Sequence, residues 1–358
     1  MKQLNQLRKQ IDKIDEQILK VLSQRGKLAQ EIGKIKKDGG GAVHVPSREK
    51  MVFDRVTSLN KGPFKNEALL SIFREIISAT RSLEAPLKIS YLGPEATFTH
   101  MAAVSHFGSS AEMVPSSGIQ AIFDDVEKGH SDYGVVPIEN TTEGVVSHTL
   151  DLFADFSLQV CAEVVIRVSH HLLSAEPDLK KIKKVYSHPH ALAQCRQWLA
   201  RNIPHAVLKE TESTAQAAEK AAREKNTGAI ASVIASSVYG LPILKKEIQD
   251  QPHNFTRFLV IGHHAAGPTG RDKTSLLFTI RDEVGGLHKV LEPLALAGVN
   301  LTKIESRPLK KKAWEYMFFV DLDGHAGDER IATALEEVKK KCVVFKIIGS
   351  YPKSGFAA

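Results

Sequence analysis

The chain has 358 residues, of which 42% are hydrophobic and 25% charged. This length and composition predict a packed protein of two or three domains and exclude an intrinsically disordered one. The formal net charge is +7. The lysine clusters contain no interleaved aromatic residues, so the charge is typical of solvated surfaces and we expect no nucleic-acid partner. The clusters are Lys180, Lys181, Lys183 and Lys184; Lys310, Lys311 and Lys312; and Lys339, Lys340 and Lys341.

The cysteines and the N-terminus predict a cytoplasmic protein. Cys161, Cys195 and Cys342 are far apart in the sequence, which favours a reducing compartment without a disulfide framework. No signal peptide follows Met1, and no stretch approaches the ~18 apolar residues of a membrane span. We also expect no metal or organic cofactor. The pair His263-His264 lies in a linker without a third ligand.

Residues 1–84 are expected to be helical. A heptad-like apolar seam runs without a cap from residue 4 to 37 and predicts a helix roughly 50 Å long. Such a helix cannot cover its own apolar stripe, so we expect it to pack against a second subunit. Residues 38–41 should end it, and shorter helices should follow over 47–60 and 66–84. The seam consists of Leu4, Leu7, Ile11, Ile14, Ile18, Val21, Leu28, Ile32 and Ile35.

Charged residues interrupt this seam. Arg25 takes a core position, which is costly unless the charge is paired. Arg8 and Lys36 share a heptad position beside the seam. On the third helix one stripe turns from apolar to polar: Phe73, Ile77, Thr80 and Glu84. Each residue alone is compatible with coiled-coil register or a surface salt bridge, but together they indicate a buried anion site.

These residues resemble the all-helical chorismate mutase family, in segments 7–15, 24–36, 46–49 and 73–78. The resemblance implies that Arg8, Arg25 and Arg48 surround two substrate carboxylates, with Arg8 reaching into the partner subunit's site. It places Lys36 and Glu84 at the breaking ether oxygen. Glu49 and Thr80 would lie near the ring hydroxyl and the ether. Val45 stands where many relatives have Asp.

The implied reaction is a Claisen rearrangement, which needs no nucleophile. It needs a dianion folded into a reactive conformation and positive charge where the ether oxygen becomes negative. Glu84 can donate a hydrogen bond there only while it is protonated, and we expect burial to favour that form. Many relatives have Gln at this position.

Residues 87–264 alternate short strands with helical stretches, an α/β pattern whose length fits two lobes around a cleft. Two polar runs lie where ligands bind in such folds. We expect the strand over 133–138 to end before the run 139–144, because Gly and polar groups do not suit a central strand. The run 254–258 mixes an amide, a hydroxyl and an Arg with Phe residues. Strands are expected at 89–92, 133–138, 184–186, 229–231 and 258–261, and a helix at 213–224.

Four motifs in order, at 91–99, 136–141, 187–194 and 255–258, resemble prephenate dehydratase. The resemblance implies a periplasmic-binding-protein-like two-lobed fold. It also implies a catalytic and binding set of Asn140, Ser187, Gln194 and Thr256, with substrate contacts from Thr97, Thr99 and Arg257. A Thr hydroxyl is a poor acid, so Thr256 would hydrogen-bond or relay a proton to the leaving oxygen. The alternative for Asn140 and Thr256 is turn or cap chemistry. Ala96 replaces a usual Gly.

Residues 272–352 predict a ferredoxin-like βαββαβ module, with elements at 275–280, 287–297, 300–305, 316–322, 330–340 and 343–348. It resembles the ACT regulatory domain of such dehydratases, which binds L-phenylalanine between subunits. The implied effector contacts are Gly286, Leu287, Asn300, Leu301, Glu305, Ser306 and Arg307. The alternative is that Gly286 only permits a tight turn and that Arg307 pairs with Glu305.

The resemblance to bifunctional chorismate mutase/prephenate dehydratases spans nearly all residues from 4 to 350. It implies conversion of chorismate to prephenate and of prephenate to phenylpyruvate, feedback by L-phenylalanine, and a homodimer or homotetramer. One alternative is an arogenate dehydratase. Another is a non-catalytic two-lobed ligand sensor, against which the complete set of Asn140, Ser187, Gln194 and Thr256 argues.

Overall fold

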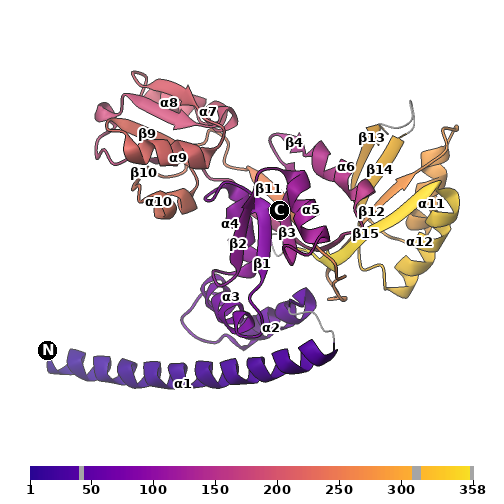
Figure 1. Cartoon of the computed structure of the whole chain (residues 1–358), viewed down its shortest axis with the longest axis horizontal. Coiled ribbons are helices and arrows are strands. Elements are labelled where there is room, and N and C mark those ends of the chain that lie inside the picture. Colours follow the sequence, from indigo (N-terminus) through magenta and orange to yellow (C-terminus); the bar gives the residue numbers. More distant parts are fainter. Residues whose placement is uncertain (40–43, 309–315, 355–358) are drawn as a thin grey trace. The chain divides into compact units, whose positions relative to one another are not determined.

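The computed structural model describes residues 1–39, 44–308 and 316–354. The chain forms two compact units (Figure 1). The first comprises Met1–Leu87 with His106–Glu112, and the second comprises Lys88–Ser105 with the chain from Met113 onward. The lysine cluster 310–312 and part of the expected helix break, residues 40–41, lie outside the described residues. No helix in the described ranges is both long and apolar enough to cross a membrane.

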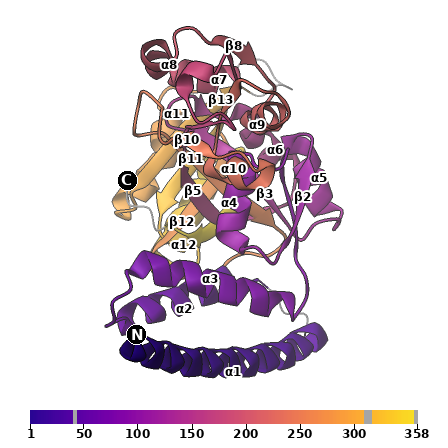
Figure 2. The ribbon, with the colours of Figure 1, turned by 90° about the vertical axis from the view of Figure 1, so that its left-hand side faces the viewer.

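The first unit is helical, as predicted. Figure 2 shows α2 and α3 lying along one side of the long helix α1. The apolar seam of α1 is largely open to solvent in a single chain; Ile11, Ile14 and Ile18 are 56%, 53% and 51% exposed. One chain therefore leaves most of this stripe uncovered. The helices are α1 (Lys2–Gly39), α2 (Pro46–Leu59) and α3 (Asn66–Ser82).

The middle segment has two lobes, each built on its own sheet. The first sheet has the order β2-β1-β3-β11-β5, with β4 paired to β3, and the second has the order β10-β6-β9-β7-β8. The first lobe contains β1 (Lys88–Leu92), α4 (Phe98–Phe107), β2 (Glu112–Ser116), α5 (Ile119–Glu127), β3 (Tyr133–Asn140), β4 (Gly144–Val145), α6 (Ser147–Asp155), β5 (Gln159–Arg167) and β11 (Phe255–Gly262). The second contains β6 (His171–Leu173), a 3-10 turn (Leu179–Lys181), β7 (Lys184–Ser187), α7 (Pro189–Gln194), α8 (Arg196–Asn202), β8 (Val207–Glu210), α9 (Thr214–Arg223), β9 (Thr227–Ala231), α10 (Val233–Tyr239) and β10 (Ile243–Lys245).

The chain passes between the lobes twice. It leaves the first lobe after β5 and returns just before β11, and the amide of Val168 donates to the carbonyl of Asn254 at 2.8 Å where the two crossovers meet. This arrangement confirms the predicted two-lobed α/β fold.

Two strands are longer than expected. β3 continues through Asn140 and β11 begins at Phe255, so the prediction that the polar run could not extend a central strand was wrong. The polar side chains find partners on the neighbouring strand, where Asn140 pairs with Thr256 and Glu139 with Arg257 in register. The next pair is Phe258 with Pro137, so Ile138 forms a bulge behind these pairs.

The C-terminal module has the predicted ferredoxin-like order. Its sheet runs β13-β14-β12-β15, and α11 and α12 share a core with one face of it. The other face packs on the first lobe; Phe319 and Tyr351 share a buried core with Val160 and Leu259. The elements are β12 (Asp272–Thr279), α11 (Gly286–Leu296), β13 (Leu301–Pro308), β14 (Tyr316–Asp323), α12 (Glu329–Lys341) and β15 (Val344–Pro352).

Candidate active sites

Four of the residues predicted for the helical site meet where α1 crosses α3. Arg25 is half-buried, and its guanidinium donates to the Thr80 hydroxyl and to the carbonyl of Ile76. Burial lowers the pKa of Arg25, and the nearby Glu84 opposes that shift. Lys36 Nζ lies 3.2 Å from Glu84 Oε2. Two cations, a hydroxyl and a carboxylate therefore meet here, and their role as an anion site stays a prediction.

A glycine lets the helices approach at this point. A methyl group added to Gly33 would lie 3.0 Å from Cβ and 3.1 Å from Cα of Glu84. These distances are tight for carbon atoms, so Gly33 allows Glu84 to reach Lys36. Gly33 lies within segment 24–36, which resembles the mutase family, but no sequence pattern marked it as a contact point.

Glu49 belongs to a buried cluster that sequence reasoning missed. Its Oε1 lies 2.6 Å from Arg81 Nη1, and its Oε2 lies 3.7 Å from His44 Nε2. Arg81 also donates to the Phe107 carbonyl at 2.6 Å. Burial alone would raise the pKa of Glu49, but His44 and Arg81 outweigh it and lower the pKa to about 2. Glu49 is thus a fixed carboxylate whose position depends on Arg81.

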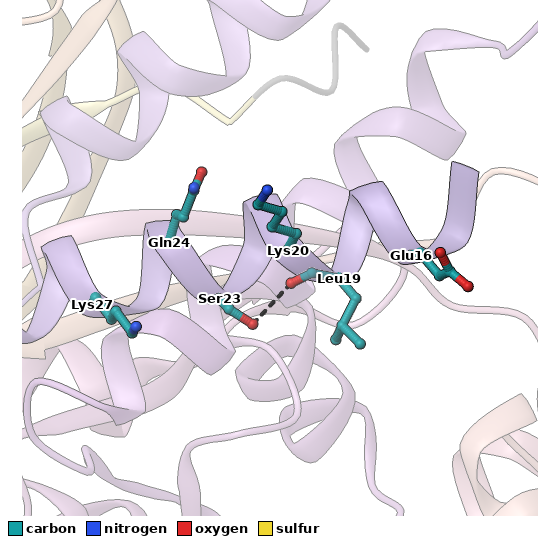
Figure 3. Close-up of a pocket in the computed structure, with 6 residues that line it drawn as sticks. All are labelled: Glu16, Leu19, Lys20, Ser23, Gln24 and Lys27. Carbon is teal, nitrogen blue, oxygen red and sulfur yellow. Dashed lines mark hydrogen bonds between the residues drawn. The ribbon is translucent and has the colours of Figure 1, made fainter. Parts of the chain in front are cut away.

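Arg8 and Arg48 lie on the surface of the single chain. Arg48 borders a hollow with apolar residues of α2 and Phe73 of α3. A second hollow runs along α1, and Figure 3 shows that all of its lining side chains come from that one helix. They are Glu16, Leu19, Lys20, Ser23, Gln24 and Lys27. A hollow walled by one helix needs another surface to enclose it.

In the two-lobed segment a chain of hydrogen bonds links the predicted catalytic residues. Asn140 Nδ2 donates to Thr256 Oγ1 at 2.7 Å and to Asn254 Oδ1 at 2.8 Å. Asn254 Nδ2 donates to Gln194 Oε1 at 2.9 Å. The first lobe supplies Asn140 and Thr256, α7 of the second lobe supplies Gln194, and Asn254 stands at the crossover. The chain therefore joins the lobes.

Two further residues extend this set. His170 Nε2 lies 2.9 Å from Gln194 Oε1, and Gln194 Nε2 donates to Glu143 Oε1 at 3.1 Å. Burial lowers the pKa of His170, and Gln194 partly offsets the shift. No sequence pattern marked His170. It contacts Gln194 only because it lies where the chain leaves the first lobe after β5.

Asn140 makes both kinds of contact considered from the sequence, those of a turn residue and those of a site residue. Its Oδ1 accepts from the amides of Thr142 and Glu143 at 2.8 and 3.0 Å, an Asx-type turn. Its Nδ2 remains directed to Thr256 and Asn254. The turn contacts therefore use the Asn140 oxygen and leave its Nδ2 to orient toward Thr256 and Asn254.

The other predicted contacts of this site have local partners. Thr97 Oγ1 accepts from the amide of His100, which caps α4, and donates to Leu92 O at 3.1 Å. Thr99 is buried in α4. Ser187 is fully buried and donates to Ile230 O at 2.7 Å. Ala96, also buried, adopts a left-handed φ of +68°.

Arg257 lies on the face of β11 opposite Thr256. Its guanidinium contacts Glu163 at 2.8 Å, Asp321 at 2.6 Å and Glu139 at 3.1 Å. Burial would lower the pKa of Arg257, but Tyr351 and these carboxylates raise it well above its usual value. This placement does not favour the substrate contact expected of Arg257.

The predicted effector residues lie at two ends of the C-terminal module. The register aligns Leu301 with Thr274 across β14, and Arg307 with Thr279. Gly286 and Leu287 follow β12 and therefore lie at the same end of the sheet as Ser306 and Arg307. Asn300 and Leu301 lie at the other end, about 20 Å away along β13. Glu305 lies in the Arg307 half of the strand.

The sequence left two alternatives to effector binding: a tight turn at Gly286 and an ion pair between Arg307 and Glu305. The local contacts at these ends are as follows. Gly285 takes a left-handed φ of +75°, so this glycine pair does permit a tight turn into α11. Arg307 Nε lies 3.5 Å from Asp151 Oδ1 of α6. Asn300 Nδ2 donates to Asp323 Oδ2 at 3.2 Å.

Comparisons with known proteins agree with this geometry. Three family models match in order: chorismate mutase type II over residues 7–85, prephenate dehydratase over 89–266, and the ACT domain over 274–340. The chain is 52% identical over 358 residues to a bifunctional chorismate mutase/prephenate dehydratase of Aquifex aeolicus, covering 99% of both chains.

Two solved structures resemble the part of the chain that follows the helices. A prephenate dehydratase from Arthrobacter aurescens in complex with L-Phe has a TM-score of 0.69 and 33% identity, covering 74% of this chain and 90% of that one. GqqA, described as a novel type of quorum quenching acylase, has a TM-score of 0.70 and 28% identity, covering 75% and 99%.

Proposed function

Because the chain belongs to the family of bifunctional chorismate mutase/prephenate dehydratases, we propose that it supplies phenylpyruvate for L-phenylalanine biosynthesis in the cytoplasm under feedback by L-phenylalanine. The observation that carries the proposal is the hydrogen-bonded chain from Thr256 through Asn140 and Asn254 to Gln194. This chain supports the proposal because its amide and hydroxyl groups come from both lobes and are linked to one another.

For the mutase step, Arg25 and Lys36 provide the positive charge that the rearrangement needs. Arg25 is held by Thr80, so its charge is preorganised for a substrate carboxylate. Lys36 is placed to stabilise the ether oxygen as that oxygen becomes negative. In the proposed mechanism Glu84 leaves Lys36 and assists at the same oxygen as a protonated donor.

For the dehydratase step, the substrate loses its ring hydroxyl and carbon dioxide together. Asn140 donates to the Thr256 oxygen, so the Thr256 proton is free to point at the leaving hydroxyl. If Thr256 only hydrogen-bonds to that oxygen, the group departs as hydroxide and takes a proton from solvent. If Thr256 relays a solvent proton to it, the group departs as water. Formation of the aromatic ring supplies most of the driving force.

Regulation is proposed to need a second chain. The predicted effector residues stand at both ends of the C-terminal module, so one chain cannot gather all of them around one amino acid. A partner molecule in antiparallel contact would bring the Gly286 end of one chain to the Asn300 end of the other. The open seam of α1 likewise supports a homodimer or a larger homo-oligomer.

Product analysis tests this function against its alternatives. Purified protein given chorismate should form prephenate and then phenylpyruvate, and L-phenylalanine should slow the second step. An arogenate dehydratase would instead form phenylalanine from arogenate and leave prephenate unchanged. A non-catalytic sensor would bind prephenate without turnover. Binding without product would contradict the proposal.

A further inference from the structure

The strand pair that carries the dehydratase residues has two differently used faces. Thr256 pairs with Asn140 and Arg257 with Glu139 in the β11–β3 register. Successive residues in a strand point to opposite faces. One face therefore holds the contact between Thr256 and Asn140. The other holds the ion pair between Arg257 and Glu139, at 3.1 Å.

Charged and polar groups of the C-terminal sheet bind the residues on this second face. Asp321 of β14 lies 2.6 Å from Arg257 Nη1, and Tyr351 of β15 accepts from Arg257 Nη2 at 3.0 Å. Lys303 of β13 forms an ion pair with Glu139. Lys303 and Asp321 are themselves paired in register, so neighbouring positions on the C-terminal sheet bind neighbouring positions on the catalytic strands.

Burial makes these contacts restrictive. The side chains of Arg257 and Asp321 are 8% and 1% exposed, and those of Lys303 and Glu139 are 12% and 31% exposed. A buried charge that loses its partner is strongly unfavourable. A shift of β13 must therefore either carry Glu139 with it or break the pair, and Glu139 is joined by one peptide bond to Asn140.

We propose that Lys303 is a positioning residue of the dehydratase, which fixes Asn140 and Thr256 through Glu139 and transmits movements of β13 to them. β13 also carries most of the predicted effector residues, Leu301, Glu305, Ser306 and Arg307. The regulatory part of this inference rests on the proposed feedback by L-phenylalanine. The positioning part needs only dehydratase activity.

Lys303→Met tests the role, because it keeps most of the length of the side chain and removes its charge. Lys346→Met is the matched control. Lys346 joins β15 to the first lobe through the carbonyls of Phe153 and Phe156, which lie in and just after α6, whereas the partner of Lys303 lies in β3. We expect Lys303→Met to lower the dehydratase kcat about tenfold with little change in KM. Lys303→Arg should restore most of the rate, and Lys346→Met should leave it unchanged.

A double mutant and the effector separate positioning from general docking. If Lys303 acts through Glu139, adding Glu139→Gln to Lys303→Met should cost less than the two single effects combined. L-phenylalanine should still shift the melting temperature of Lys303→Met but should inhibit it far less than the parent.

Two results would overturn the proposal: a parental kcat in Lys303→Met, or an equal loss in Lys346→Met. If the parent enzyme dehydrates prephenate but ignores L-phenylalanine, the proposed feedback fails. The kcat comparison then still decides the positioning role.

Discussion

The role proposed for Glu84 as a protonated donor can be tested through the pH dependence of the mutase step. Glu84 assists the ether oxygen only while it carries a proton, so mutase kcat should fall as pH rises. A Gln at this position donates at any pH. We therefore expect Glu84→Gln to flatten the pH profile of kcat for chorismate, with the dehydratase profile of the same preparation as the control. Identical mutase profiles in the two proteins would remove this role.

His106 should control the acid stability of the helical unit. Burial lowers its pKa to about 3, with His44 contributing and Glu49 opposing. An unfolded His titrates near 6.5, so between about pH 6.5 and 3 the unfolded chain binds the extra proton. Above pH ~6.5 the His106 group should cost no stability. Below that pH the free energy of unfolding should fall by about 1.4 kcal/mol per pH unit.

Urea unfolding between pH 6.5 and 4.5 measures this slope. His106→Leu should reduce it, and His205→Leu, which changes an exposed histidine, should not. Glu49 adds a separate loss at lower pH, between about 4.3 and 2, because its folded pKa is the lower one. An unchanged slope in His106→Leu would contradict the assignment.

At the residue scale, sequence predicted side chains that share a periodic stripe better than those joined by tertiary contacts. Arg25, Thr80, Glu84 and Lys36 follow helical spacing and do meet. Arg81 and His170 depend on partners far away in sequence, so no local pattern marked them. For Arg257 the motif suggested a substrate contact, but strand alternation separates it from Thr256. The alternation could not be read from the sequence, because the predicted strand begins only at Phe258, whereas β11 begins at Phe255.

At the scale of elements, the open seam of α1 predicts active sites that combine two chains. Arg8→Ala and Arg25→Ala should each abolish mutase activity. After the two variants are unfolded, mixed and refolded, half of the dimers are mixed and one of their two sites is intact. About a quarter of the parental activity should return. Return of no activity, with dimers present by light scattering, would contradict a shared site.

The close crossing of α1 and α3 gives a second test. Gly33→Ala should push the Glu84 backbone away by a few tenths of an ångström and lower mutase kcat, by about tenfold or more. Ala also favours the helix by about 1 kcal/mol over Gly, so the melting temperature should not fall. Gly62→Ala, at an open position, is the control. Parental mutase activity in Gly33→Ala would show that this approach is unimportant.

Element types were predictable because the helical and strand periods are strong in this chain. The expected helices and the βαββαβ order were confirmed with small shifts at their ends. The ends of β3 and β11 were not predictable, because polar residues extend a strand only when the neighbouring strand supplies partners. Those partners lie over 100 residues away in the sequence.

At the scale of the molecule, one chain carries a mutase and a dehydratase, and the C-terminal sheet packs against the first lobe of the dehydratase. Gly349 of β15 illustrates this packing: a methyl group there would overlap the carbonyl of Val160 in β5. The C-terminal sheet and the dehydratase segment therefore belong to one compact unit, and the mutase helices form the other.

The most direct test follows chorismate, prephenate and phenylpyruvate together in the parent enzyme, Arg25→Ala and Thr256→Ala. We expect the parent enzyme to convert chorismate to phenylpyruvate and Thr256→Ala to stop at prephenate. Arg25→Ala should leave chorismate untouched but still dehydrate added prephenate. Phenylpyruvate formation by Thr256→Ala at the parental rate, or loss of both steps in folded Arg25→Ala, would contradict two separate sites built on these residues.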